Sequence, residues 1–337
     1  MKKIIYTISL LIITFGSLFY SSNVRASENK ADFSVSAEQS DYQINKQKTY
    51  FDLSLPVKES IPLTIHVTNN SNESIDIQGE ISPATTNLNG VVEYSQTNDE
   101  LTGNQPFDIN EVATLEKDIQ TIPPKQTVDF VVNVCVPTND YSGVVAGGIT
   151  FRDVTEKKEN DKNRSMFQNK FAYSIALILH GKRNDAKTEL SLQDITPEQI
   201  NSRNVLTANI HNDSPNYVNK VSIDAKVIDS NKKEILSQKK ENMQIAPDSV
   251  FKFPVYYEEE KMNAGTYTIQ LVIKSNDLEW NLSKEFTIRK DTATKLNAAD
   301  VIQNSKIKDN LMVYLLIGLV ICLTILVIIL YRKINSV

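Results

Sequence analysis

Apolar and polar residues alternate along five segments of the chain between residues 61 and 273. The segments are 61–67 (IPLTIHV), 127–134 (TVDFVVNV), 171–179 (FAYSIALIL), 220–228 (KVSIDAKVI) and 266–273 (TYTIQLVI). A period of two, with many β-branched and aromatic residues, predicts strands that bury one face. Long helical periodicity is absent before residue 290. The pattern therefore predicts an all-β fold.

The β-rich region repeats one order of segments. HVTNNS, IPPKQTVDFVV and PTNDYSGVVAGGITF in the first half correspond to NIHNDS, IAPDSVFKFPV and MNAGTYTIQLVIKS in the second. In each half, a strand ends in an Asn/Ser turn, a proline turn leads into the next strand, and a Tyr/Gly turn leads into another. This spacing predicts two tandem immunoglobulin-like β-sandwich domains, and the tyrosine beside each glycine is similar to the corner tyrosine of such folds.

A polar, strongly charged stretch, TEKKENDKNR (155–164), separates the two halves. It has no apolar residue to bury, so it reads either as a solvated linker or as the tip of a long hairpin. We place the first sandwich at residues 31–153, the linker at 154–164 and the second sandwich at 165–290.

The start of the chain has the pattern of a secretory signal peptide. Two lysines precede an apolar run, 4–20, and the sequence VRA follows. Small or medium residues three and one positions before a bond favour cleavage there. We predict a signal peptide at residues 1–26 with cleavage between Ala26 and Ser27. An uncleaved N-terminal anchor is the alternative.

Near the C-terminus, no charged residue interrupts the run from Leu311 to Leu330. About 20 helical residues span roughly 30 Å, the thickness of a bilayer's hydrocarbon core. Arg332 and Lys333 follow, and basic residues favour the cytoplasmic side. We predict a transmembrane helix at 311–331 as the membrane anchor, preceded by a juxtamembrane segment (291–310) and followed by a cytoplasmic tail (332–337). A buried core helix is the alternative.

Charge and cysteine content narrow the class of protein. A net charge of −5 gives no reason to expect nucleic acid as a partner. Cys135 is the only cysteine between the two apolar ends, so that region can form no internal disulfide. Exported animal modules of this size usually carry disulfides. The composition therefore favours a bacterial surface, most simply a Gram-positive one, with Cys135 as a small buried residue.

Three of the ten glycines lie in GVVAGGITF (143–151). A phosphate-binding loop needs such glycines between a strand and a helix N-terminus. Here strand-like residues continue after Gly148, and no Lys-Ser or Lys-Thr pair follows it. We therefore expect a tight turn at Gly143. At Gly147 and Gly148 we expect a bulge or a close backbone approach within a strand.

The sequence offers few candidate catalytic or metal-binding residues. The three histidines have no partner at metal-ligand spacing, and G-x-S-x-G and H-E-x-x-H are absent. We predict no catalytic, cofactor or metal site. The first half differs from the second by a long polar segment, 82–118, which carries Tyr94 and Phe107. With Tyr141, these aromatic residues are candidate binding residues; a hairpin that only extends a sheet is the alternative.

Longer blocks of sequence resemble the WxL-interacting protein family of Gram-positive bacteria. In the first half these blocks are FSVSAEQSDYQINKQKTYFDL, SPATTNLNGVVEYS and YSGVVAGGITF; in the second they are NKFAYSIALIL, KKENMQIAPDSVFKFPV and GTYTIQLVIKSNDLEWNLSKEFTI. The resemblance covers nearly all of the region between the apolar ends.

The resemblance implies a surface protein without catalysis. Together with the predicted anchor, this gives a single-pass membrane protein whose bulk lies outside the cell at the wall, with a cytoplasmic C-terminus. It implies a peptidoglycan-binding first domain and a host-binding second domain. Peptidoglycan, WxL-domain surface proteins and host extracellular proteins are the partners it suggests, with no cofactor. A cell-wall-modifying enzyme with β-sandwich binding modules is the alternative.

Overall fold

The computed structural model describes residues 32–95, 101–155, 171–183, 185–257 and 261–301, together with residues 317, 318, 321 and 325. The predicted signal cleavage site at Ala26 and Ser27 lies outside these residues. So do the predicted anchor positions Leu311, Leu330, Arg332 and Lys333. Within the described part of the chain, no helix is long and apolar enough to cross a membrane.

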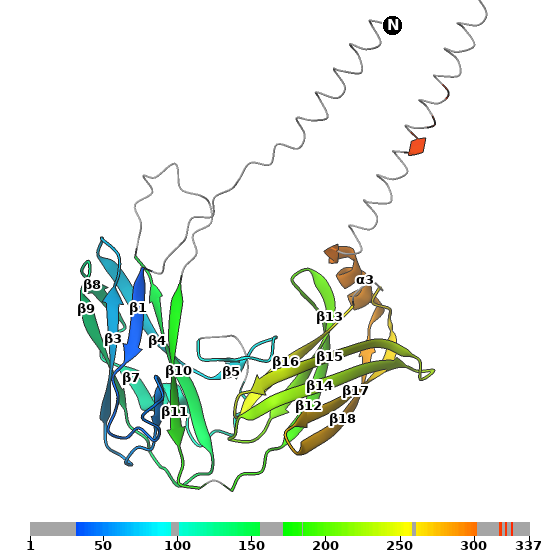
Figure 1. Cartoon of the computed structure of the whole chain (residues 1–337). Coiled ribbons are helices and arrows are strands. Elements are labelled where there is room, and N and C mark those ends of the chain that lie inside the picture. Colours follow the sequence, from blue (N-terminus) through cyan, green and yellow to red (C-terminus); the bar gives the residue numbers. More distant parts are fainter. Residues whose placement is uncertain are drawn as a thin grey trace, which may run out of the picture.

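Two sheets enclose one hydrophobic core in the first half of the chain (Figure 1), and their strand orders are β1-β3-β9-β7 and β2-β11-β10-β4-β8. Alternation builds this first sandwich: Leu63, Ile65 and Val67 of β3 are buried, and the intervening side chains are only partly so. The strands are β1 (Phe33–Ala37), β2 (Phe51–Leu53), β3 (Ile61–Asn69), β4 (Ile75–Pro83), β7 (Ala113–Leu115), β8 (Ile119–Ile122), β9 (Thr127–Val134), β10 (Val144–Asp153) and β11 (Ala172–His180).

A second core lies between the sheets β12-β13-β16-β5-β6 and β15-β14-β17-β18. The strands of this second sandwich are β12 (Leu190–Ile200), β13 (Arg203–Asn212), β14 (Val218–Asp229), β15 (Glu234–Ile245), β16 (Ser249–Tyr256), β17 (Gly265–Ser275) and β18 (Leu278–Ile288). The predicted all-β fold is confirmed, and the immunoglobulin-like class of the two sandwiches stays a prediction.

The boundary between the halves differs from the one expected. β11, which we predicted to belong to the second sandwich, pairs with β10 along Arg152↔Ala172 to Val144↔His180 and, in parallel, with β2. The predicted linker 154–164 therefore connects two paired strands of the first sandwich, although residues 156–170 lie outside the described part. Alternation could not assign β11, because its period is the same in either sheet.

The described residues 84–95 and 101–107, here called the arm, leave the first sandwich and join the second. They carry β5 (Thr85–Thr86) and β6 (Val92–Glu93), and β5 pairs in parallel with β16 at Phe251↔Thr86. The arm thus adds two short strands to a sheet of the second sandwich (Figure 1). The rest of the predicted insertion returns to the first sandwich as α2 (Ile109–Val112) and β7.

The internal repeat is visible in two fully buried asparagines that end equivalent strands. Asn69 donates through Nδ2 to the carbonyls of Glu73, Ile122 and Pro123, at 2.8, 2.9 and 3.1 Å. Asn212 donates to the carbonyls of Asn216 and Ala246, at 2.8 and 2.7 Å. Both amide oxygens accept from the serine two residues later. Each side chain therefore ties an Asn/Ser turn to a proline turn, as the shared sequence plan predicted.

Two further expectations are corrected. Cys135 is exposed instead of buried, because it lies on the outward phase of the alternation, between the buried Val134 and Val136. The predicted juxtamembrane segment begins with α3 (Lys290–Ala299), which packs Ala293 into the second core. Asn297 of this helix bonds to Asn204 and Met262, so α3 is part of the second sandwich.

Candidate functional site

The two sandwiches meet where the arm crosses from one to the other, and we call this region the junction. Backbone and side-chain groups of the arm bond to the turn between β15 and β16 and to the end of β15. The bonds are Thr102 N to Asp248 O (3.1 Å), Gln105 Nε2 to Asp248 O (2.7 Å), Ala246 N to Thr86 Oγ1 (2.9 Å) and Gln244 N to Gly90 O (2.8 Å). The second sandwich therefore supplies hydrogen-bond partners for polar groups of the insertion.

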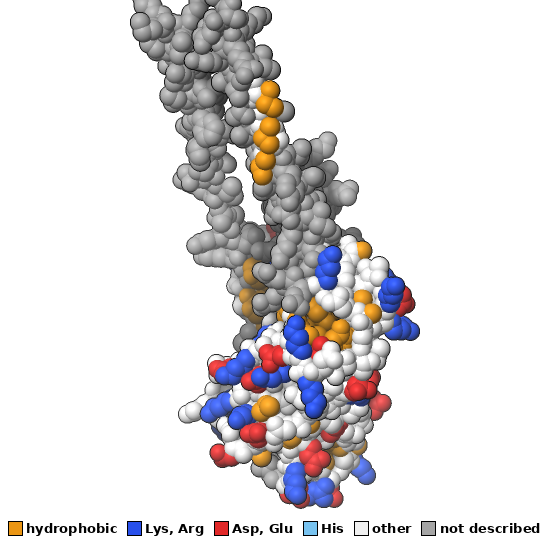
Figure 2. Space-filling model, turned by 90° about the vertical axis from the view of Figure 1, so that its right-hand side faces the viewer, with side chains coloured by type: hydrophobic (Ala, Val, Ile, Leu, Met, Phe, Trp, Pro, Cys, Tyr) orange, Lys and Arg blue, Asp and Glu red, His pale blue; other side chains and the backbone are white. Residues whose placement is uncertain are grey.

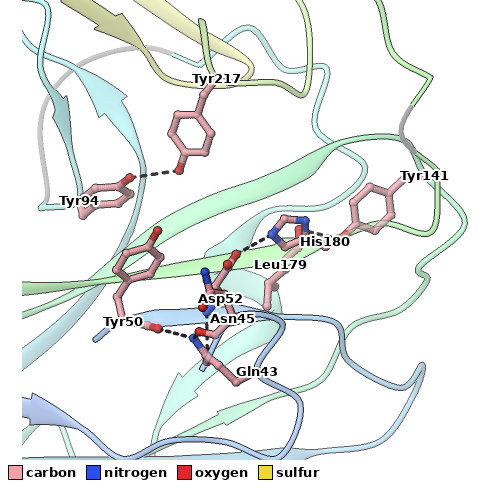
Figure 3. Close-up of polar contacts among 9 residues, drawn as sticks. All are labelled: Gln43, Asn45, Tyr50, Asp52, Tyr94, Tyr141, Leu179, His180 and Tyr217. Atoms are coloured by element: carbon pink, nitrogen blue, oxygen red, sulfur yellow. Dashed lines mark hydrogen bonds and ion pairs between the residues drawn. The ribbon is translucent and has the colours of Figure 1, made fainter. Parts of the chain in front are cut away.

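Tyr94 lies where the arm passes over β10. Its carbonyl oxygen accepts from Thr150 Oγ1 at 3.2 Å, and its hydroxyl lies 3.2 Å from that of Tyr217 in the second sandwich (Figure 3). An added Cβ at Gly148 would stand 2.1 Å from the Tyr94 oxygen. The glycine therefore allows the close backbone approach that we expected, and the β10 pairings run without a bulge.

The turn glycine also meets the second sandwich. Gly143 has φ +75°, in the left-handed region that favours glycine, and an added Cβ would lie 2.3 Å from the Pro215 carbonyl oxygen. Val144 N donates to that same oxygen at 2.8 Å. The left-handed backbone at Gly143 fits the glycine requirement that we expected there, and this position serves as a contact between the two sandwiches.

Phe107 and Tyr141 lie below the surface, in the core of the first sandwich. Their rings pack edge to face with centroids 5.6 Å apart, and the Tyr141 hydroxyl donates to the Leu179 carbonyl at 3.1 Å. Burial raises the pKa of the Tyr141 phenol. This placement favours a packing role for both rings, and binding through them stays a prediction.

Tyr50, Tyr94 and Tyr217 form a group that we call the tyrosine cluster. All three are partly buried and pack on Val144, Ala176 or Ile178 of β10 and β11, and the Tyr50 ring points toward the other two (Figure 3). Burial raises the pKa of Tyr94, and burial raises that of Tyr217 well above its usual value. The cluster joins the first sandwich, the arm and the second sandwich.

Charged groups flank the tyrosine cluster on the first sandwich. The Lys48 ammonium lies 5.1 Å from the centroid of the Tyr50 ring, within the range of a cation–π interaction. His180 Nε2 lies 2.6 Å from Asp52 Oδ1, and Gln43 Nε2 donates to the Tyr50 carbonyl at 2.8 Å. Sequence reasoning missed Tyr50 and Tyr217, because no local signal shows that residues so far apart converge.

A cavity of about 120 Å³ lies beside the cluster at the junction. Its walls come from the arm and the start of α2, from β10 and from the β15–β16 turn: Pro83, Ala84, Leu101, Gln105, Phe107, Asp108, Ile109, Val144, Val145, Ala146, Pro247 and Asp248. Asp248 is only 2% exposed. Burial, together with the nearby Asp213 carboxylate, raises the pKa of Asp248 to about 6.

Among the described residues, no three histidine, cysteine or carboxylate side chains are grouped as metal ligands. His66 Nδ1 lies 2.7 Å from Asp129 Oδ1, and His211 Nδ1 lies 3.9 Å from Asp213 Oδ1. Charges of both signs are interspersed on the face of the molecule shown in Figure 2. This face presents no broad cationic surface of the kind that nucleic acid attracts.

Two family models match the chain and together cover most of it. "WxL Interacting Protein, peptidoglycan binding domain" matches residues 33–153, and "WxL Interacting Protein, host binding domain" matches residues 162–298. The chain belongs to the WxL-interacting protein family. In this member of the family, the matched host-binding region includes β11, which completes the first sandwich.

Among curated proteins, none matches the sequence of this family member. Solved structures with similar features include the YadV chaperone (11% identity, covering 76% of this chain and 100% of that one, TM-score 0.30). The E. coli chaperone DraB (14%, 76% and 95%, TM-score 0.30) and the Salmonella enterica SafA pilin in complex with the SafB chaperone (9%, 79% and 100%, TM-score 0.31) are also similar. TM-scores near 0.3 do not establish a shared fold.

Proposed function

We propose that this chain is a noncatalytic scaffold of the Gram-positive cell surface that binds peptidoglycan and WxL-domain proteins, with host extracellular proteins as further partners. The family match over residues 33–298 carries this proposal, because both matched families are binding domains. Two immunoglobulin-like sandwiches form the extracytoplasmic part. The predicted signal peptide directs export and is cleaved between Ala26 and Ser27. The predicted helix between Leu311 and Leu330 then holds the chain at the membrane, with Arg332 and Lys333 inside.

We place the wall-contacting surface at the tyrosine cluster. Tyrosine rings offer large contact area with few rotatable bonds, and their hydroxyls add hydrogen bonds to a polar ligand such as a glycan. Lys48 and the Asp52–His180 pair supply charged neighbours. In this proposal Tyr94 contacts the ligand, and Phe107 and Tyr141 support the surface from the core.

Capture of insoluble cell wall by the purified chain tests the proposal. We expect the chain to sediment with the wall and Tyr50→Ala to weaken capture by more than about 1 kcal/mol, as for an interface anchor. Tyr42→Ala is the matched control, because Tyr42 is an exposed tyrosine outside the cluster. Equal capture by all three proteins would move the binding surface elsewhere.

A zymogram on whole cell walls separates the scaffold from the wall-modifying enzyme. Capture without clearing of the wall supports the scaffold, whereas clearing would overturn it. Membrane fractionation tests the anchor: a chain truncated before Leu311 should appear in the medium, and its retention by membranes would contradict a single C-terminal anchor.

A further inference from the structure

The junction cavity contains a buried carboxylate without a partner. Asp248 lines the cavity, and among the described residues its side chain has no hydrogen bond and no ion pair. Its backbone is fully engaged: the N–H donates to Ser214 O at 3.0 Å, and the carbonyl accepts from Thr102 and Gln105. A buried charge is costly unless it is paired. The structure therefore fixes this carboxylate in place and leaves its charge uncompensated.

Two hydroxyls close to the cavity are also without partners. Ser82 Oγ and Thr102 Oγ1 are buried and have no hydrogen-bond partner among the described residues. Each is adjacent in sequence to a residue of the cavity wall, Pro83 and Leu101 respectively. Buried polar groups in proteins are nearly always hydrogen-bonded. These two hydroxyls are not part of the cavity wall, so Asp248 is the unpaired group that lines the cavity itself.

The remaining wall is mainly apolar, with Ala84, Phe107, Ile109 and residues 144–146 forming most of it. Asp108 also lines the cavity, but it is exposed and its carboxylate already caps α2 by accepting from Asn110 N at 2.9 Å. A cavity of about 150 Å³ in another protein holds benzene. A volume of about 120 Å³ therefore fits a group of roughly five heavy atoms.

We propose that this cavity binds a primary alkylammonium group, such as the end of a lysine side chain. An ammonium pairs with the Asp248 carboxylate through charge-assisted N–H donors, and the apolar wall accommodates the methylene stem. A divalent cation fits less well, because it needs several oxygen or nitrogen ligands and only one carboxylate here is free. The amine can come from peptide chains of the wall or from a lysine of a protein partner.

Titration of the purified full chain with Nα-acetyl-lysine methylamide tests the site. We expect this probe to bind the wild-type chain at pH 7.5. The Nε-acetylated probe should bind the wild type at least tenfold more weakly. The unmodified probe should bind Asp248→Asn at least tenfold more weakly than it binds the wild type. Asparagine keeps the shape and tolerates the positive φ (46°) of this turn position. Asp277→Asn, in the β17–β18 turn, is the matched control and should bind normally. Equal binding to Asp248→Asn, or none to the wild type, would overturn the proposal.

A second measurement separates binding from a purely structural effect. Carboxyl NMR should show the Asp248 pKa falling when the lysine probe binds, because an ammonium stabilises the carboxylate. Affinity should also fall as the pH drops below about 6, where Asp248 becomes protonated. Asp213 and Asp108 are the other carboxylates that face this region, so both need the same NMR titration. An unchanged Asp248 pKa would contradict direct contact.

Wall capture decides the source of the amine, and this experiment rests on the proposed function. If wall peptides supply it, acetylation of wall amines should weaken capture of the wild type and leave that of Asp248→Asn unchanged. If acetylation changes nothing while the lysine probe binds, a protein lysine is the source. Failure of all wall capture would overturn the proposed function alone, because the probe titration tests the cavity independently.

Discussion

Small side chains and single polar atoms determine how closely the two sandwiches approach. Gly143 and Gly148 leave room for backbone from Pro215 and Tyr94, and the hydroxyls of Tyr94 and Tyr217 meet at 3.2 Å. Asn69 and Asn212, in contrast, act within their own sandwiches by holding buried backbone carbonyls. The packing of a residue at the junction therefore depends on both sandwiches.

Gly148→Val should destabilise the chain by about 1–3 kcal/mol, because the new side chain overlaps the Tyr94 carbonyl and overpacking costs about that much. Thermal unfolding measures the loss. Gly103→Asn is the control, since nothing lies within 4 Å of an added Cβ there and asparagine tolerates a positive φ. Unchanged unfolding of Gly148→Val would show that the arm does not hold this position.

Asp248→Asn should stabilise the chain above pH 6. The folded pKa of Asp248, about 6, lies above its usual value of 3.8, so the ionised form is disfavoured by folding. Stability is therefore lost as the pH rises from about 4 to 6 and stays lower above that range. Removing the charge should recover about 1–3 kcal/mol at pH 7.5 and nothing at pH 3.5. Denaturant unfolding at both pH values checks this, and an equal gain at both would contradict it.

At the scale of elements, the arm and β11 are the features that join the two halves. β10 has both faces largely covered, one by the core of the first sandwich and the other by the arm and the tyrosine cluster. The short β5 occupies the side of β16 that would otherwise be an open sheet edge. Unpaired edges invite association with other chains, so the arm also protects the second sandwich.

Thr86→Val should weaken the contact between the arm and the second sandwich. Valine has nearly the shape of threonine but cannot accept from the buried Ala246 N–H, and an unsatisfied buried donor costs about 1–3 kcal/mol. Hydrogen exchange should show faster exchange in β5 and β16. Thr127→Val, at an exposed threonine pair, is the control and should leave exchange in β16 unchanged.

At the scale of the whole molecule, the two matched domains are interlocked. β11 lies between β10 and β2 in the first sandwich, and the arm lies in the second. A division of the chain at the linker would therefore remove a central strand from the first sandwich. It would also separate the arm from β16.

A fragment of residues 32–153 should fail to unfold cooperatively, whereas residues 32–183 should do so. The shorter fragment lacks β11, which contributes the buried Ile175, Leu177 and Leu179 to the first core. Circular dichroism during heating, together with gel filtration, compares the two fragments. A cooperative, monomeric 32–153 fragment would show that β11 is dispensable.

The strands and turns of this protein follow from local sequence. Period-two alternation predicted an all-β chain, and the shared HVTNNS and NIHNDS segments predicted equivalent turns, because side-chain direction and turn chemistry depend on neighbouring residues. The strand residues on both sides of Gly148 likewise indicated a sheet at that position.

Only the tertiary structure decided which sheet β11 joins, where the arm lies and that Asp248 is buried without a partner. Tyr94 and Tyr217 are 123 residues apart, and no local pattern encodes their contact. Alternation specifies that one face of a strand is buried but not what buries it. That choice depends on the combined packing of both cores, which a reading of neighbouring residues cannot supply.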